Sequence, residues 1–513
     1  MSLPSPAAAV RTRRDDTVLG VLRSPRLLTR EALAGIVTTL ALVPEVISFS
    51  VIAGVDPMVS LVASIVLALV MSLLGGRPAM VTAAAGSVAL VIAPLVRAHG
   101  VEYVLPTVLL AGVIQIAFGT AGLARLMRFI PRSVMIGFVN ALGILIFMAQ
   151  VPHLIDVPWI VYPLFVLTIA IVVLLPRLTK AVPAPLVAIV VVTVIVVVAG
   201  LDVTTVGDEG EMGGGLPGLT PWLVPFSLET LGIILPTALS VAFVGLMETL
   251  LTAKLVDDLT ETPSHKGKES WALGVANIAA GAYGGIAGCA MIGQTVVNVK
   301  IGRARTRVST VVAGLFLLLL VTALSEVMAR IPMVALAAVM MIVAISTVDW
   351  HSVRPSTLRR MPIPETLVMV VTVAVVVATD NLALGVAVGV LLAMVLFARR
   401  IAHVIRVERT VEGGAASAEG VVPGTEAGAV RYDVIGPLFF GSSNDLVEHF
   451  SYADDPARVT VDLTRASVWD ASSVAALDAI ATKYAAHDVD VTFVGLDERS
   501  SEFHGRLTGR LGS

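Results

Sequence analysis

Apolar stretches long enough to cross a membrane follow one another along most of this chain, from about residue 31 to about residue 402. A helix crosses the hydrocarbon core of a bilayer in about 20 apolar residues. Only 14% of the 513 residues are charged, against about a quarter in an ordinary soluble domain. The sequence therefore predicts an all-α polytopic membrane domain. Fourteen segments fit, at approximately 31–53, 58–75, 80–96, 101–120, 131–150, 158–175, 183–200, 229–256, 270–286, 290–300, 307–326, 331–349, 363–380 and 382–402.

The Lys and Arg residues of the loops give an independent test of this count. With fourteen spans and a cytosolic N-terminus, the even-numbered loops face the cytosol and carry sixteen basic residues, against two, Arg97 and Arg330, in the odd-numbered loops. Cytosolic loops of membrane proteins carry such an excess. The pattern predicts fourteen spans with both termini in the cytosol. The sixteen are Arg77, Arg125, Arg128, Arg132, Arg177, Lys180, Lys254, Lys266, Lys268, Lys300, Arg303, Arg305, Arg307, Arg354, Arg359 and Arg360.

The two ends of the chain differ from the apolar middle. Residues 1–30 are rich in Arg and lack the apolar core and cleavage site of a signal peptide, so we expect a cytosolic tail. Residues 403–428 contain a Gly/Ala/Ser/Glu-rich stretch that predicts a linker. Residues 429–513 show strand-like alternation, a helical pattern and a further strand, which predict a small cytosolic α/β domain.

The composition gives no support to several functional classes. The single cysteine, Cys289, excludes an internal disulfide and a cysteine-based metal cluster, and the eight His residues show no metal-ligand spacing. We therefore expect no metal and no cofactor. A net charge of −3 gives no reason to expect nucleic-acid binding, and no nucleotide-binding loop is seen that would drive a pump.

Two predicted spans are interrupted by small residues. Fourteen spans divide into seven plus seven, and an odd-numbered unit repeated in one chain must be inverted, as in many secondary transporters. The third segment contains 83–87 (AAAGS) and the tenth is led by 284–290 (GGIAGCA), so the two occupy matching positions. We expect each to be an extended piece followed by a half-helix, whose N-terminus exposes unpaired N–H groups and partial positive charge. Two such ends would form an anion site; the alternative is that the small residues only allow close helix packing.

Two carboxylates lie near the middle of predicted spans, Glu45 in the first and Glu248 in the eighth. Charged groups at mid-membrane are costly and mark ion or proton pathways by default. The alternative is a structural carboxyl satisfied by neighbouring backbone or hydroxyl groups. Among the amides within spans, Gln294 and Asn298 in the tenth segment are singled out by their place in the half-helix, whereas Gln115 and Asn277 are expected to bond between helices.

Several motifs together resemble the sulfate permease (SulP) group of anion transporters, which is related to the animal anion exchangers and prestin. The resemblance covers nearly the whole chain, and the C-terminal part resembles a STAS domain. The carrying residues are 42–50 (LVPEVISFS), 53–57 (AGVDP), 75–78 (GGRP), 128–134 (RFIPRSV) with Gly137 and Phe138, Glu248, 274–277 (GVAN), 284–288 (GGIAG), Asn298, Gly302, 462–464 (DLT) and 470–473 (DASS).

The resemblance implies a core lobe and a gate lobe that move against each other, with the fifth to seventh and twelfth to fourteenth spans in the gate. Glu45 resembles the proton-coupling carboxyl of some bacterial members, and Glu248 matches an acidic position on the eighth span. A homodimer in the bacterial plasma membrane is also implied. The residues implied to surround the anion between the half-helices are Gly86, Ser87, Cys289, Ala290, Met291 and Ile292, with Phe49 lining the pocket.

Two departures from the family pattern bear on the coupling ion. Many members have Ser-Arg-Thr early in the tenth half-helix, whereas this chain has Gly293-Gln294-Thr295. Sodium-coupled bicarbonate members carry an Asp one turn after the eighth-span Glu, where this chain has Thr252. Both departures favour proton coupling over sodium coupling.

The leading hypothesis is a secondary active transporter that carries a small anion (a dicarboxylate, sulfate or bicarbonate) with protons by alternating access, and no enzymatic activity. An anion channel or an uncoupled exchanger on the same fold is the alternative, although a passive anion conduit gains nothing from a titratable group at Glu45. A membrane-anchored signalling protein ranks last, because an anchor does not need fourteen spans.

Overall fold

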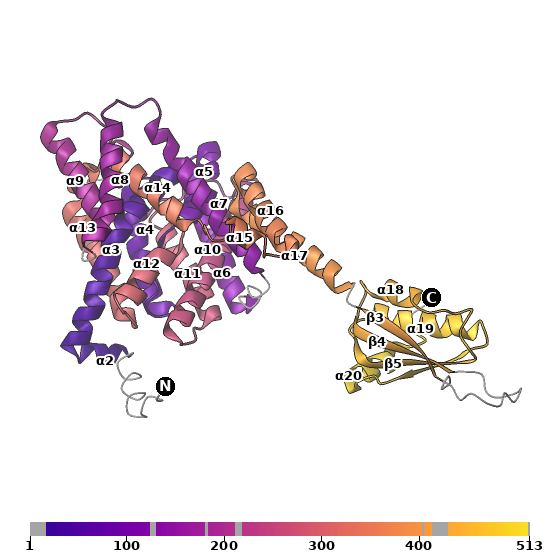
Figure 1. Ribbon diagram of the computed structural model, residues 1–513. Helices are drawn as coiled ribbons and strands as arrows, with labels where there is room; N and C mark the ends of the chain where they lie inside the picture. The colour runs from indigo at the N-terminus through magenta and orange to yellow at the C-terminus, as the bar shows by residue number, and fades with distance from the viewer. Residues whose placement is uncertain are drawn as a thin grey trace, which may run out of the picture. The chain divides into compact units, whose positions relative to one another are not determined.

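The computed structural model divides into two compact units, Met1–Val390 and Leu391–Ser513 (Figure 1). It describes residues 17–123, 130–179, 183–210, 218–402, 405–412 and 429–510. Some expectations lie outside these residues: the first part of the N-terminal tail, the basic residues Arg125, Arg128 and Lys180, and most of the linker.

The first unit is built from helices, and each of the fourteen predicted segments has a helical counterpart. In the described part of the chain, eight helices are long and apolar enough to cross a membrane, and four apolar helices are shorter. The count of fourteen spans stays a prediction. The elements are α2 (Val18–Leu22), α3 (Pro25–Ala53), α4 (Pro57–Leu74), β1 (Thr82–Ala84), α5 (Gly86–His99), η1 (Val101–Tyr103), α6 (Val104–Thr120), α7 (Arg132–Gln150), η3 (Val151–Leu154), α8 (Val161–Leu178), α9 (Ala184–Ala199), η4 (Val206–Asp208), α10 (Leu228–Thr260), α11 (Lys266–Gly281), β2 (Gly288–Ala290), α12 (Ile292–Val296), η5 (Val297–Ile301), α13 (Arg307–Ala329), α14 (Met333–Thr347), α15 (Pro355–Leu358), α16 (Ile363–Thr379) and α17 (Leu382–Ala402).

The helices of the first unit pack in two groups. In one group α3, α4 and α13 contact one another, α11 packs on α4 and α6, and α10 packs on α5 and α6. In the other, α14 contacts α7, α8 and α9, and α16 packs on α7. The groups meet where α3 contacts α9 and α14 and where α5 contacts α7. These groups correspond to the core and gate lobes that the resemblance implies.

Buried charged side chains fasten one end of the core group. The Arg77 guanidinium, which follows α4, binds Asp257 at 3.1 Å and the carbonyl oxygen of Thr262 at 2.9 Å, both beyond or near the end of α10. The Glu269 carboxylate in the first turn of α11 accepts hydrogen bonds from the backbone N–H groups of Gly76 and Arg77. Glu31 in α3 accepts from the N–H of Arg305 at 2.7 Å, just before α13. The first two sets of bonds join the end of α4 to α10 and α11, and the third joins α3 to the start of α13.

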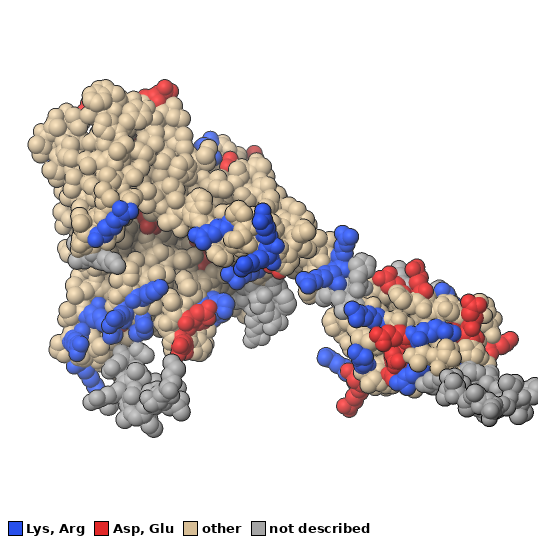
Figure 2. Space-filling view, in the orientation of Figure 1, with Lys and Arg blue, Asp and Glu red and all other residues tan. Residues whose placement is uncertain are grey.

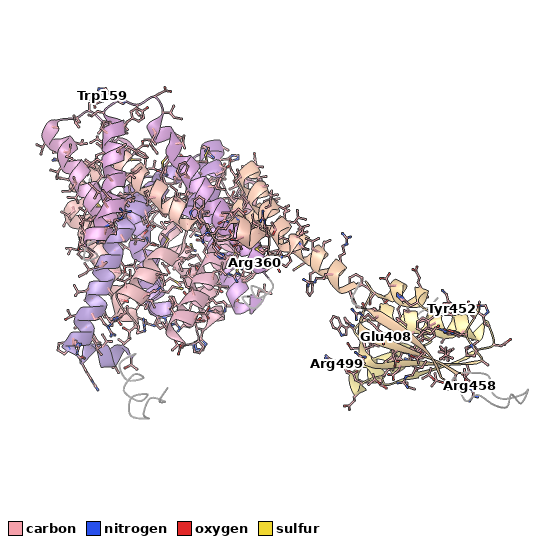
Figure 3. All side chains as sticks on the ribbon, in the orientation of Figure 1. Trp159, Arg360, Glu408, Tyr452, Arg458 and Arg499 are labelled. Atoms are coloured by element: carbon pink, nitrogen blue, oxygen red, sulfur yellow. The ribbon has the colours of Figure 1, made fainter. Side chains whose placement is uncertain are left out.

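The charges of the first unit are unevenly placed. In the view of Figure 2, Lys and Arg side chains gather on the part of the unit where α2 lies, while the end around α8 and α9 shows none. Trp159, 75% exposed, lies at that second end, and Arg360 lies away from it near α15 (Figure 3). Tryptophan is enriched at membrane interfaces and basic residues on the cytosolic side. Which loops face the cytosol stays a prediction.

The second unit is a four-stranded sheet with helices. The order is β3–β4–β5–β6, with β3 antiparallel to β4 and the other pairs parallel. The predicted strands and helix correspond to β4, β5, α19 and β6, whereas β3, α18 and α20 were not predicted. β3 falls inside the range expected for the linker. The elements are β3 (Arg406–Glu412), β4 (Ala429–Leu438), α18 (Ser443–Glu448), β5 (Arg458–Val468), α19 (Ala471–Ala485), β6 (Asp490–Val494) and α20 (Glu498–Leu507).

A hydrophobic core with one buried acid holds this unit together. Apolar residues that alternate along β4 and β5 pack against α19, as their buried side chains show. The Asp455 side chain is fully buried and accepts hydrogen bonds from the hydroxyls of Tyr432 and Tyr484, each at 2.6 Å. Arg409 of β3 pairs with the same carboxylate at 2.8 Å. The unit therefore buries its own core, as an independent domain does.

Candidate anion-binding site

The two interrupted segments meet as a short antiparallel ribbon. β1 pairs with β2, with Thr82 opposite Ala290, Ala83 opposite Cys289 and Ala84 opposite Gly288. Each strand leads directly into a half-helix, α5 or α12. Because the strands are antiparallel, the two helices leave opposite ends of the ribbon, offset by roughly 7 Å along it. The extended pieces and half-helices expected at 83–87 and 284–290 are therefore present and adjacent.

Both half-helices begin with unpaired backbone donors. Among the described residues, no hydrogen bond engages the N–H groups of Gly86, Ser87 and Val88, or those of Ile292, Gly293 and Gln294. Neither helix has a side-chain cap. Such N–H groups carry partial positive charge and attract anions. The ribbon thus presents two electropositive helix ends without a basic side chain in either half-helix start.

The end of α5 is closed by an aromatic ring. A Cβ atom at Gly86 would lie 2.5 Å from Cε1 of Phe49, so the ring rests against the first residue of the helix. Phe49 is 3% exposed and Gly86 is buried. Phe49 thus lies at the proposed site, and glycine at position 86 is needed because any side chain would collide with the ring.

Ser87 and Cys289 point toward Glu248. The Ser87 hydroxyl donates to Oε2 of Glu248 at 2.6 Å, and the Cys289 thiol donates to the same oxygen at 2.5 Å. Their Oγ and Sγ atoms lie 4.0 Å apart. Glu248 on α10 therefore fastens the start of α5 to β2. The sequence placed all three residues at the site but did not foresee that they bind one another.

The start of α12 is more open than that of α5. Ile292 is 39% exposed, and a Cβ atom added at Gly293 would meet no atom within 4 Å. The preceding N–H groups are already engaged: Ala290 donates to Thr249 Oγ1 at 3.0 Å and Met291 to the carbonyl oxygen of Val81 at 2.9 Å. The free donors of this segment are consequently those of the first helical turn itself.

Glu45 joins α3 to the same half-helix. Its half-buried carboxyl group lies beside the side chain of Gln294, which is itself 4% exposed. Pro44 precedes it inside α3. The structure therefore forms two pairs at the ribbon, Glu45 with Gln294 on the α12 side and Glu248 with Ser87 on the α5 side.

Further polar side chains hold the ribbon in place. Asn277 of α11 accepts from the N–H of Gly288 at 2.7 Å and donates to Gln115 of α6 at 2.8 Å, which confirms the expected bonding of these two amides between helices. The hydroxyls of Ser64 and Thr249 accept from the N–H groups of Ala84 and Ala290. Sequence reasoning missed these two hydroxyls, and their only signal was a polar residue in an otherwise apolar span.

The described residues contain no group of three or more His, Cys, Asp or Glu side chains placed to hold a metal ion.

Comparison with known proteins identifies the family. Residues 28–161 and 157–372 match the sulfate permease family, and residues 423–503 match the STAS domain. The chain belongs to the sulfate permease family. The Bacillus subtilis protein YbaR, which carries a sulfate-transporter name, is 48% identical over 92% of this chain and 95% of its own length.

Two solved structures share the fold. The transmembrane domain of the cyanobacterial bicarbonate transporter BicA aligns with a TM-score of 0.62 and 25% identity over 72% of this chain and 98% of that domain. The murine anion transporter Slc26a9, in its inward-facing state, aligns with a TM-score of 0.80 and 17% identity over 93% of this chain and 87% of its own. This sulfate permease family chain is thus a multi-pass membrane protein with a C-terminal STAS domain.

Proposed function

We propose that this family member carries a small anion together with protons by alternating access, with the anion held between the starts of α5 and α12. The anion belongs to the sulfate, bicarbonate or dicarboxylate class. Fourteen spans, cytosolic termini, a bacterial plasma membrane and a homodimer belong to the same proposal.

The observation that carries the proposal is the Glu45–Gln294 pair. It links a half-buried carboxyl group on α3 to the first turn of α12, whose neighbours Ile292 and Gly293 are exposed. Protonation of Glu45 removes a negative charge beside the electropositive helix start and so favours a bound anion. Loss of the proton from Glu45 restores the negative charge and weakens anion binding. Because the binding of one ligand must change the binding of the other by the same factor, proton and anion are thermodynamically linked.

In this proposal, alternating access is a movement of the core group against the gate group. The ribbon is fixed inside the core group by Asn277, Ser64 and Thr249, so an anion bound there would travel with that group. The main contacts of the gate group with the core are those of α3 with α9 and α14 and of α5 with α7. A site near the repeat interface, exposed to one side and then the other, is the general arrangement of secondary transporters.

Uptake into proteoliposomes tests the proposal. Purified protein is reconstituted, and uptake of radiolabelled sulfate, bicarbonate, succinate and chloride is compared with and without inward proton or sodium gradients. We expect one class of anion to accumulate above its external concentration only with a proton gradient. Equal uptake with no gradient would indicate a channel or uncoupled exchanger, and accumulation driven by sodium would overturn the proton assignment.

A further inference from the structure

The bond between Ser87 and Glu248 has a direction that depends on the proton. A serine hydroxyl has one hydrogen to donate and two lone pairs to accept, whereas an ionised carboxylate can only accept. With Glu248 ionised, the Ser87 hydrogen is committed to Oε2 at 2.6 Å, and the Cys289 hydrogen to the same oxygen at 2.5 Å. In that state Ser87 has no hydrogen left for an anion.

We propose that protonation of Glu248 reverses this bond and converts Ser87 into a hydrogen-bond donor for the transported anion. A proton on Oε2 is donated to Oγ of Ser87 across the same short distance, and the Ser87 hydrogen turns away from Glu248. No heavy atom has to move, and no bond other than O–H is involved. This inference rests on the proposed anion site. It adds that Ser87 donates to the anion only when Glu248 is protonated.

Ser87 lies where its hydroxyl hydrogen, once freed from Glu248, can be donated to an anion at the start of α5. It is the second residue of α5, where the N–H groups of Gly86, Ser87 and Val88 have no partner among the described residues. A hydroxyl that donates from this turn adds one hydrogen bond to those of the helix end. Hydrogen bonds to charged groups are stronger than those between neutral groups, so one added donor is expected to change anion affinity about tenfold.

The surroundings of Glu248 contain no cation that would hold it ionised. Its side-chain bonds go to Ser87 and Cys289 alone among the described side chains. The elements packed against α10 carry few titratable or charged groups, and apart from Cys289 these lie at helix ends. They are Arg97 and His99 in α5, Lys266, Lys268 and Glu269 in α11, and Lys300 in η5, while α6 and α12 carry none.

The single thiol reports the protonation of Glu248 without any ligand. Because Cys289 is the only cysteine, its S–H stretching band in the infrared spectrum is assigned without ambiguity. We expect the band at low frequency when the thiol donates to ionised Glu248, and a shift to higher frequency on acidification. In Glu248→Gln, the S–H frequency should stay near the wild-type value at acidic pH, whatever the pH. A band that does not move between alkaline and acidic pH would overturn the proposal.

Equilibrium binding of radiolabelled sulfate, succinate and chloride, tested in turn on the full-length protein, completes the test. All proteins compared carry Glu45→Gln, which removes the acid response of that carboxyl, and this background should bind its preferred anion about tenfold more tightly at acidic pH. Glu248→Gln should bind at alkaline pH with the acidic affinity. Ser87→Ala should lose most of the acid enhancement, and adding Glu248→Gln to it should restore nothing. Ser60→Ala, which removes a buried hydroxyl with no partner from α4, should keep the enhancement.

The outcomes separate this inference from the function on which it rests. If Ser87→Ala keeps the full acid enhancement, simple repulsion between Glu248 and the anion explains the effect and the reversal is wrong, although proton-driven uptake can stand. If no anion binds or accumulates, the proposed function fails, while the movement of the S–H band still decides whether Glu248 releases its donors.

Discussion

The centre of the membrane unit and the STAS domain hold their acidic side chains in different ways. At the ribbon, Glu248 accepts from a hydroxyl and a thiol, and Glu45 lies beside an amide, all of them neutral. In the STAS domain, Asp455 pairs with Arg409 and Asp462 pairs with Arg431. A carboxylate beside a cation is held ionised, whereas one held by neutral donors can take up a proton without leaving a buried cation unpaired.

Under the proposed function, this difference separates the acids assigned to transport from those that stabilise the STAS domain. Removing the charge at Glu45 or Glu248 should change coupling and leave the fold intact, whereas removing Asp455 should destabilise the STAS domain and leave the anion site intact. Each of the following predictions tests one side of that contrast.

The largest effect is expected for Glu45→Gln. The amide keeps the size and polarity of the side chain beside Gln294 but cannot release a proton. We expect loss of proton-driven accumulation, while anion still exchanges across the membrane to equal concentrations. Flux into proteoliposomes with an imposed pH gradient measures this. Glu326→Gln, on α13 outside the ribbon, is the matched control and should accumulate as wild type does; concentrative uptake by Glu45→Gln would contradict the assignment.

The next effect is on the stability of the STAS domain. Asp455→Ala leaves two buried tyrosine hydroxyls without their acceptor, which should cost about 3 kcal/mol in the free energy of unfolding. Urea unfolding of residues 405–513 expressed alone measures it, followed by the fluorescence of Trp469, the only tryptophan in that segment. Asp454→Ala, the exposed neighbour, should change stability by less than about 0.5 kcal/mol. Similar losses in both variants would show that the buried pairing does not stabilise the domain.

A charge added at the open end of α12 should weaken anion binding. Position 293 has no atom within 4 Å of an added Cβ, so Gly293→Gln and Gly293→Glu can be compared without a clash. The glutamate offsets the helix-end potential, which contributes up to about 2 kcal/mol when partly buried. We expect Gly293→Glu to bind anion up to roughly 30-fold more weakly than Gly293→Gln. Equal affinities would place the anion elsewhere.

The smallest effect is the acid sensitivity of the STAS domain. Hydrogen bonds from the side chain and N–H of Thr464 lower the pKa of Asp462, and those of Ser500 lower the pKa of Asp497. A carboxyl whose folded pKa is below its unfolded value stabilises the fold above the unfolded pKa, and this contribution is lost as pH falls below about 4. Urea unfolding of residues 405–513 at decreasing pH should show the loss, and Asp497→Asn should show less of it. An identical pH profile in the variant would count against this contribution.

Much of the fold could be predicted because its signals are local. Twenty-residue apolar runs and the small residues at 83–87 and 284–290 placed the helices and the two breaks. Antiparallel pairing of β1 with β2 could not be predicted, since a three-residue strand carries no periodicity. β3 was missed because it begins directly after α17 and lies next to a Gly-rich stretch, although it completes the sheet edge beside β4.

The side chains of the site were predicted better than their bonds. Glu45, Glu248, Ser87 and Gln294 were all singled out, yet sequence spacing gives no information on which acid meets which donor across 161 residues of chain, the separation of Ser87 and Glu248. The buried acids Glu31 and Glu269 were not foreseen, because they lie at helix ends, where charged residues are usually solvated. Their partners are backbone N–H groups and, for Glu31, also the hydroxyl of Thr306, and no sequence pattern reveals them.

The proton carried with the anion is the central claim, and the pH inside proteoliposomes measures it most directly. A pH-sensitive dye is trapped inside, and the transported anion is added outside with no initial pH gradient and with the membrane potential clamped by an ionophore. The account predicts that anion entry acidifies the interior in the wild type and not in Glu45→Gln. Entry of anion into wild-type proteoliposomes at an undiminished rate with no change of internal pH would contradict it.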